Sequence, residues 1–224
     1  FEDLVLGTAD GIVFALGNNG KPKWWIQLDA APVGPIASSK NGNLIVVTRQ
    51  GTLWKFRPPS PKERTAPGAI SANYLPLKSV GPVTAFGENM ALVAGHDATL
   101  TLLKRHPNRA GAAWSVRLKR RLGFYPLTAA RALADRFIVS DRKGILSAFN
   151  GEKYHYRIRL SRSALGTPRL ISEGRTTSAI VGSAEGDVWV LNSKGEVRWQ
   201  KNISGIISRR PLLHSDGEIL VVAA

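Results

Sequence analysis

Short apolar runs rich in β-branched residues recur along the chain in pairs, and a tight polar turn separates the two members of each pair. Runs of this length, bounded by Gly and Asp, predict β-strands that are joined by hairpin turns. The five pairs are Leu4–Gly7 with Gly11–Leu16, Ile45–Thr48 with Gly51–Phe56, Ala91–Ala94 with Ala98–Leu103, Phe137–Ser140 with Gly144–Phe149, and Ala179–Gly182 with Gly186–Leu191.

The pairs recur at a nearly constant period, because the second runs begin at residues 11, 51, 98, 144 and 186. Prolines with similar spacing predict a further strand ahead of a pair, and aromatic residues after the second runs mark a fourth strand. The prolines are Pro35, Pro82, Pro126, Pro168 and Pro211. The aromatic residues are Trp24 and Trp25, Trp114, Tyr154 and Tyr156, and Trp199. Each unit therefore predicts four short antiparallel strands.

Four-stranded units repeated every 40 to 47 residues predict an all-β fold, a β-propeller, because stacked sheets bury both faces of each other. A β-sandwich with coincidental spacing is the alternative, although its strands would alternate more cleanly between apolar and polar residues. We expect one propeller domain over residues 1–224, with about five full repeats and a partial one. Its repeats are expected at about 1–30, 31–79, 80–118, 119–160, 161–203 and 204–224.

The segments Ala15–Trp24 and Val190–Trp199 share a sharper motif, in which a Gly stands five residues and a Trp nine residues after the start. This motif resembles the quinoprotein-type (PQQ-like) propeller repeat, and in particular its non-catalytic branch, which includes the propeller lipoprotein of the barrel assembly machinery. The resemblance implies that Trp24, Trp114 and Trp199 dock between neighbouring blades. We also expect a partial or processed chain, belonging to a ring of six to eight blades.

The charge of the chain is strongly asymmetric, with 31 Lys and Arg residues against 16 Asp and Glu residues. A net charge of +15 attracts acidic proteins, anionic lipid headgroups or nucleic acid. Sorting the residues by the expected turns places many cations on one face of the propeller, where we expect partner binding. These residues are Lys119, Arg120, Arg121, Arg142, Lys143, Arg162, Arg209 and Arg210. A merely solvated basic surface is the alternative interpretation.

Candidate catalytic groups are sparse. The chain has no Cys, which excludes disulfides and thiol chemistry, and its four His residues lie in separate units with no neighbouring ligand. The segment His214–Asp216 contains the residue types of a catalytic triad, but sequence neighbours cannot aim at one another as a triad requires. We therefore expect no enzymatic activity, no cofactor and no metal site.

The leading hypothesis is a non-catalytic scaffold that docks acidic partner proteins within a larger, membrane-associated assembly. The resemblance leaves a second hypothesis, a fragment of a quinone (PQQ)-dependent dehydrogenase, and the charge leaves a third, electrostatic binding of nucleic acid. Because similar propellers are often exported, a periplasmic or other extracytoplasmic location is expected. No apolar run reaches the length of a membrane-spanning helix.

Overall fold

The regular structure of the protein consists of β-strands. The computed structural model describes residues 4–39, 41–59, 68–74, 81–86, 89–95, 97–106, 114–122, 131–133, 136–173, 176–207, 210–213 and 218–222. Within these ranges every element is a strand, and the described residues include no helix with the length and apolar character needed to cross a membrane. Two compact units are formed, Phe1–His96 with Thr101–Lys119 and Asp97–Leu100 with Arg120–Ala224.

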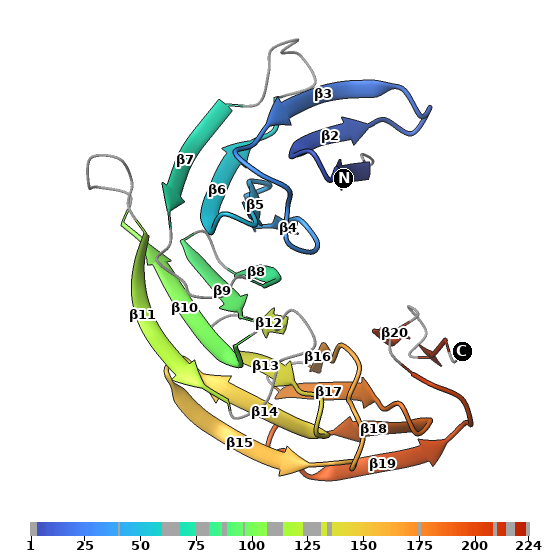
Figure 1. Ribbon diagram of the computed structural model, residues 1–224. Coiled ribbons are helices and arrows are strands. Elements are labelled where there is room, and N and C mark those ends of the chain that lie inside the picture. Colours follow the sequence, from blue (N-terminus) through green and yellow to red (C-terminus); the bar gives the residue numbers. More distant parts are fainter. Residues whose placement is uncertain are drawn as a thin grey trace. The chain divides into compact units, whose positions relative to one another are not determined.

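Antiparallel sheets follow one another along the first unit, and the strands lie in chain order within each sheet (Figure 1). The first sheet contains β1 (Leu4–Gly7), β2 (Ile12–Leu16) and β3 (Pro22–Gln27). The second sheet contains β4 (Ala37–Ser38), β5 (Leu44–Val47), β6 (Thr52–Arg57) and β7 (Gly68–Tyr74). The third sheet contains β8 (Val83–Phe86), β9 (Met90–Ala94), β10 (Thr99–Arg105) and β11 (Trp114–Arg121).

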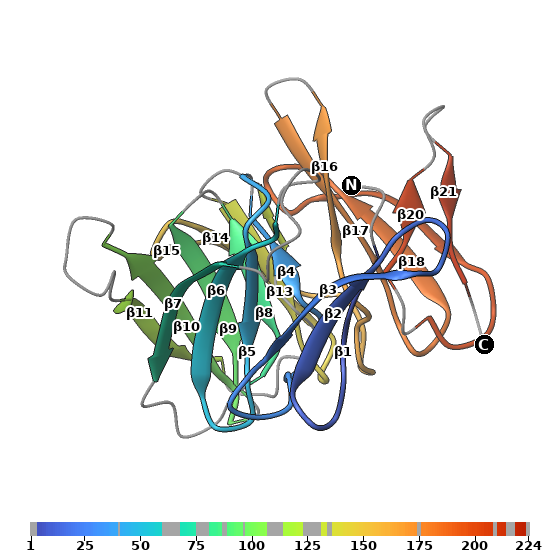
Figure 2. The same cartoon turned by 90° about the horizontal axis from the view of Figure 1, so that it is seen from above.

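The second unit repeats the same arrangement, and Figure 2 shows β16, β17 and β18 side by side and β20 next to β21. The fourth sheet contains β12 (Arg131–Leu133), β13 (Arg136–Ser140), β14 (Ile145–Asn150) and β15 (Lys153–Arg159). The fifth sheet contains β16 (Arg169–Glu173), β17 (Thr176–Gly182), β18 (Asp187–Leu191) and β19 (Val197–Asn202). The sixth sheet contains β20 (Leu212–Leu213) and β21 (Ile219–Leu220).

The predicted strand pairs are confirmed: the first pair forms β1 and β2 of the three-stranded first sheet, and each of the other four pairs forms the second and third strands of its sheet. Four of the five marker prolines, Pro35, Pro82, Pro168 and Pro211, lie one or two residues before the first strand of a sheet. Pro126 lies outside the described residues. A proline has no N–H to donate to a strand ladder, so it is best tolerated at the start of an edge strand.

Side chains from adjacent sheets form the hydrophobic cores within each unit. Val13 and Trp24 of the first sheet pack with Val46 and Phe56 of the second, in a cluster that lies within the first unit. In the second unit, a cluster of the same kind joins the fourth and fifth sheets, and Leu146 belongs to it. All four residues of β5 are buried, because one sheet covers each of its faces.

The turn that joins the two strands of a predicted pair is built in the same way in four sheets. The last residue before the turn uses its side-chain oxygen to accept a hydrogen bond from the backbone N–H four residues later, and a glycine with positive φ follows three residues after it. The accepting residues are Thr8, Thr48, Asp141 and Ser183. In the third sheet Ala98 occupies the glycine position, with a φ of 63°.

One prediction about the basic residues is wrong: Lys119, Arg120 and Arg121 were expected in a turn, but they are the last three residues of β11. The connection starts only at Leu122, whose N–H donates to the carbonyl of Ala98 at 2.8 Å. An outer strand exposes alternate side chains, so a basic run can lie on it without burying charge. A cluster of cations therefore does not by itself mark a turn.

Candidate functional site

Two connections at one end of the fourth sheet bring basic residues together. The β13–β14 turn contains Arg142 and Lys143, and the loop after β15 contains Arg162. Backbone hydrogen bonds join the turn to the loop, since Leu160 N–H donates to Gly144 O at 2.9 Å and Leu165 N–H donates to Asp141 O at 3.1 Å. The three cations therefore lie at the same end of the sheet.

Two arginines of β15 extend this group. The Nη1 atom of Arg159 donates to the carbonyl oxygen of Lys143 at 3.3 Å, and the Nη2 atom of Arg157 donates to the carbonyl oxygen of Leu122 at 3.4 Å. Leu122 follows Arg121 directly. We name the resulting group the basic rim, and it comprises Arg121, Arg142, Lys143, Arg157, Arg159 and Arg162.

Two acidic residues lie at this end of the sheet. Asp141 is buried, and its carboxylate accepts hydrogen bonds from the N–H groups of Lys143 and Ile145, both at 2.9 Å. It therefore stabilises the turn instead of facing solvent. Glu185, on the neighbouring fifth sheet, accepts a hydrogen bond from the Ser161 hydroxyl at 2.8 Å.

Arg120 is held by an aromatic stack that crosses the fourth sheet. Its guanidinium carbon lies 4.6 Å from the centre of the Tyr154 ring. Tyr154 stacks on Phe149 with ring centres 4.5 Å apart, and Phe149 stacks on Phe137 at 4.7 Å. The stacked rings link β13, β14 and β15 across the sheet, and the cation–π contact holds Arg120 against Tyr154 at the end of the stack.

The remaining predicted binding residues do not join the basic rim. Arg209 lies outside the described residues. Arg210 is half-buried, its Nε atom has no hydrogen-bond partner among the described residues, and burial lowers the pKa of its guanidinium. Lys119 is exposed near the end of β11 but belongs to the first unit. The structure thus brings Arg121, Arg142, Lys143 and Arg162 of the predicted set together.

Sequence reasoning missed Arg157 and Arg159. The signal was present, because two residues separated by one position point to the same face of a strand. Both lie on the strand that was predicted from Tyr154 and Tyr156, and their side chains alternate with the half-buried Ile158. A count of charge by strand face, in addition to the count by turn, would have found them.

The three tryptophans expected between blades differ in their surroundings. Trp24 is buried and meets the Phe56 ring edge-on, with ring centres 6.0 Å apart. Trp114 is buried in a cluster formed by the second and third sheets. Trp199, in contrast, is 44 % exposed. Its position corresponds to that of Trp24, but the third strand that would cover it is absent from the described part of the sixth sheet.

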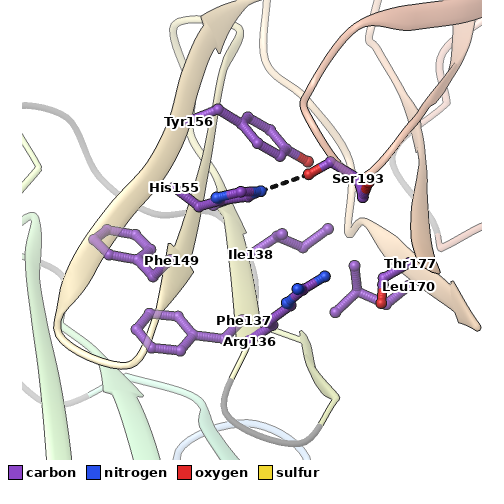
Figure 3. A pocket seen from close by; sticks show the side chains of 10 residues that line it. Arg136, Phe137, Ile138, Phe149, His155, Tyr156, Leu170, Thr177 and Ser193 are labelled. Atoms are coloured by element: carbon purple, nitrogen blue, oxygen red, sulfur yellow. Dashed lines mark hydrogen bonds between the residues drawn. The ribbon is translucent and has the colours of Figure 1, made fainter. Parts of the chain in front are cut away.

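A small pocket lies between the fourth and fifth sheets (Figure 3). His155 and Tyr156 point from β15 toward Ser193, and the His155 Nε2 atom lies 2.6 Å from the Ser193 carbonyl oxygen. Burial raises the pKa of Tyr156 to about 12. The cavity volume is about 20 Å³, which leaves room for about one water molecule, so the pocket is a packing feature of the interface.

A polar contact also joins the first and second sheets. The Asp29 carboxylate, in the loop after β3, accepts hydrogen bonds from the hydroxyls of Thr48 and Thr52 and from Trp54 Nε1, the last at 2.8 Å. Partial burial raises the pKa of Asp29, but the bonds from Thr52, Trp54 and Thr48 outweigh it and leave the pKa below its ordinary value. Asp29 is thus a structural carboxylate.

Candidate metal ligands do not cluster. Within the described ranges, no three His, Asp or Glu side chains are arranged so that they could hold a metal ion. His106 bonds through Nε2 to the Ser115 hydroxyl at 2.7 Å, and His155 contacts Ser193. His96 and the segment 214–216 lie outside the described residues.

Comparison with known proteins identifies the architecture. No family model matches the chain, and no curated protein matches it in sequence. Among solved structures, BamB from Moraxella catarrhalis is similar over 99 % of this chain and 76 % of its own, with 16 % identity and a TM-score of 0.57. BBS1N, in a complex with ARL6DN soaked with mercury, is similar over 98 % of this chain and 71 % of its own, with 14 % identity and a TM-score of 0.74. The fold is a β-propeller with four-stranded antiparallel blades.

Proposed function

We propose that this propeller is a non-catalytic scaffold whose basic rim docks an acidic partner protein within a larger, membrane-associated assembly. The observation that carries the proposal is the convergence of six cations, supplied by β11, the β13–β14 turn, β15 and the following loop, at one end of the fourth sheet. A concentrated positive field of this kind steers negatively charged partners and increases their association rate.

The chemistry of the rim suits carboxylate groups. Four of its members are arginines whose ion-pairing capacity is not used within the described part of the chain, namely Arg121, Arg157, Arg159 and Arg162. A guanidinium group offers several N–H donors in a plane and can bind a carboxylate through two parallel hydrogen bonds. Several such groups fit a protein segment rich in Asp and Glu.

The rim is also held in place before any partner arrives. Arg157 and Arg159 each donate to a backbone carbonyl, and backbone hydrogen bonds join the turn and the loop that carry the other cations. Side chains that are ordered in advance lose less conformational entropy when they bind. This supports a docking surface more than a mobile charged tail.

The comparisons support a role in protein assembly, because BBS1N, a propeller of similar fold, forms a complex with another protein, ARL6DN. We infer that this chain likewise binds protein, that its repeats belong to the PQQ-like class, and that it needs no cofactor. We also place it outside the cytoplasm, on the resemblance of its repeats to those of exported propellers. Fractionation of cells that produce the tagged protein tests this location.

Charge reversal tests the docking surface. The variant Arg121→Glu with Arg162→Glu changes two exposed rim residues, and the control variant Lys194→Glu with Lys201→Glu changes two exposed residues of the fifth sheet by the same charge. We expect the rim variant alone to lose an acidic protein in affinity purification at physiological salt. Retention of every partner by the rim variant contradicts the proposal. Loss of the partner on nuclease treatment also contradicts it, because it would indicate that nucleic acid carries the interaction.

A further inference from the structure

The strand β15 leaves one edge of the fourth sheet open. It pairs with β14 from Lys153 to Arg159, the register is regular from Tyr156 onward, and no described strand lies on its other side (Figure 1). Backbone N–H and C=O groups along such an edge form a template on which an extended peptide can add as a further strand. The edge alone is not selective, so the side chains along it decide which peptide it can bind.

The backbone groups that point outward from β15 belong to Arg157 and Arg159. In an antiparallel strand the N–H and C=O of one residue point to the same side, and those of the next residue point to the other. Leu160 N–H donates to the β13–β14 turn at 2.9 Å, so Arg159 points away from β14. Ile145, which lies opposite Arg159, agrees with this direction, because its own N–H and C=O bond to Asp141 after β13.

The side chains of these two arginines share one face of the strand. Ile158, between them, packs on the other face against the cluster that joins the fourth and fifth sheets. Each guanidinium donates to one backbone carbonyl and retains further N–H donors. Directly opposite residues of a hydrogen-bonded antiparallel pair have Cα atoms about 5.5 Å apart. A strand bonded to Arg157 and Arg159 would therefore place two alternate side chains of its own beside the two guanidinium groups.

The equivalent positions of two other outer strands carry no charge. In β3 and β19, too, the N–H of the residue after the strand donates to the turn glycine, at 2.9 and 3.0 Å, so the outward positions follow in the same way. They are Trp25 and Gln27 on β3, and Gln200 and Asn202 on β19. The amides of Gln200 and Asn202 lie 3.5 and 3.2 Å from the Asp187 carboxylate, which would repel an acidic peptide.

The outward positions of β11 are basic as well, because Leu122 N–H donates to Ala98 O at 2.8 Å and thereby directs Lys119 and Arg121 outward. The turn beside the end of β11, however, contains Asp97 and no Lys or Arg. The turn beside the end of β15 adds two cations to those of the strand. The positive charge is therefore more concentrated along the edge of β15.

We propose that the acidic partner binds as an extended segment that adds to the open edge of β15 as a fifth, antiparallel strand. This inference rests on the docking function proposed above and gives the partner a sequence pattern. It has Asp or Glu opposite Arg157 and Arg159, with an apolar residue between them beside Ile158. Further carboxylates at the end of the segment reach Arg142 and Lys143. A second copy of β15 at this edge would place like charges opposite one another, which disfavours pairing between copies.

Synthetic peptides test the binding mode. One peptide alternates Glu with Val, and a second has the same composition in two blocks. We expect the full chain to bind the alternating peptide roughly tenfold more tightly in fluorescence anisotropy at physiological salt. N-methylation of two Glu residues should weaken binding by roughly tenfold, because it removes two backbone hydrogen bonds. N-methylation of two Val residues, whose N–H groups point away from β15, is the matched control and should change little.

Hydrogen exchange of the protein gives an independent measurement. With the alternating peptide bound, the backbone N–H groups of Arg157 and Arg159 should exchange roughly tenfold more slowly. Those of Gln200 and Asn202, which point outward from β19 in the same way, are the control and should be unchanged. Unchanged exchange at Arg157 and Arg159 in a saturated complex contradicts the proposal. Slow exchange that appears without peptide and increases with protein concentration also contradicts it, since it would identify a second copy at the edge.

The outcomes separate this inference from the proposed function. If both peptides bind equally and Arg121→Glu with Arg162→Glu weakens both, the rim binds acidic segments without strand addition, so the inference is wrong and the proposed function stands. If the rim variant binds both peptides as tightly as Lys194→Glu with Lys201→Glu does, both proposals are wrong. If neither peptide binds, strand addition is wrong, and the affinity purification described above decides the proposed function.

Discussion

The guanidinium of Arg120 lies against the ring of Tyr154, 4.6 Å from its centre. This contact links the last strand of the third sheet to the last strand of the fourth. It means that one of the cations predicted to bind a partner already has a structural role inside the protein. Arg121, the next residue, is exposed and remains available for docking.

The Arg120–Tyr154 contact should be measurable by a double-mutant cycle. We expect a coupling energy of about 0.5 to 1 kcal/mol between Arg120→Ala and Tyr154→Ala in urea unfolding, because the site is half-exposed. Tyr154→Phe retains an aromatic ring and should keep most of the coupling. Additive effects of the two alanine substitutions would show that the contact contributes nothing to stability.

Two glycines at equivalent hairpin positions should respond differently to alanine. Gly195 has a φ of +87°, and a Cβ atom there would lie 2.6 Å from the Tyr156 ring. Gly20 has a φ of +73°, but its Cβ would meet no atom within 4 Å. We expect Gly20→Ala to cost about 1 kcal/mol from backbone strain alone, and Gly195→Ala to cost about 2 to 4 kcal/mol. Equal losses in chemical denaturation would contradict this packing of the fifth sheet on the fourth.

Burial of Tyr156 makes stability depend on pH in the alkaline range. Its pKa is raised from 10.0 to about 12, so the folded protein keeps a proton that the unfolded chain releases. The stabilisation is complete below pH 10 and is lost as the pH rises to 12, by about 2 to 3 kcal/mol. Unfolding free energies measured from pH 9 to 12 should show this loss in the wild type. Tyr156→Phe should remove it, and an unchanged pH profile would contradict the assignment.

Ala98 occupies a turn position that four other sheets fill with glycine at positive φ. Ala98→Gly should relieve strain that offsets the loss of the methyl group, so we expect stability to stay constant or rise by up to about 1 kcal/mol. Ala91→Gly, at a buried position in β9, is the control and should cost about 1 to 2 kcal/mol. Thermal unfolding of both variants compares the two changes in stability. Equal losses in Ala98→Gly and Ala91→Gly would show that Ala98 is unstrained.

The strands were predictable because their signals are local. The sheets are marked by local features of the sequence: apolar runs such as Ile45–Thr48, tight glycine turns and prolines. These features recur every 40 to 47 residues. The sequence alone does not mark the turn residues Thr8, Thr48, Asp141 and Ser183 as one class. Their identity varies, because any short side chain with an oxygen acceptor can make the same bond to the backbone.

The basic rim was predictable only in part. Arg142, Lys143 and Arg162 belong to short connections, whose side of the sheet follows from strand order. Arg157 and Arg159 join them through contacts with Lys143 and Leu122, and which carbonyl an arginine reaches depends on the register of neighbouring sheets. The exposure of Trp199 likewise depends on the neighbouring sheet and not on its own motif.

Photo-crosslinking from the rim tests the central proposal most directly. A photoreactive amino acid replaces Arg162 in one variant of this protein and Lys201 of β19 in another. Both positions are exposed, and crosslinking is carried out in living cells. We predict an acidic protein crosslinked from position 162 and not from position 201. Crosslinks to the same proteins from both positions, or crosslinks from position 162 only to nucleic acid or lipid, would contradict docking of an acidic protein on the basic rim.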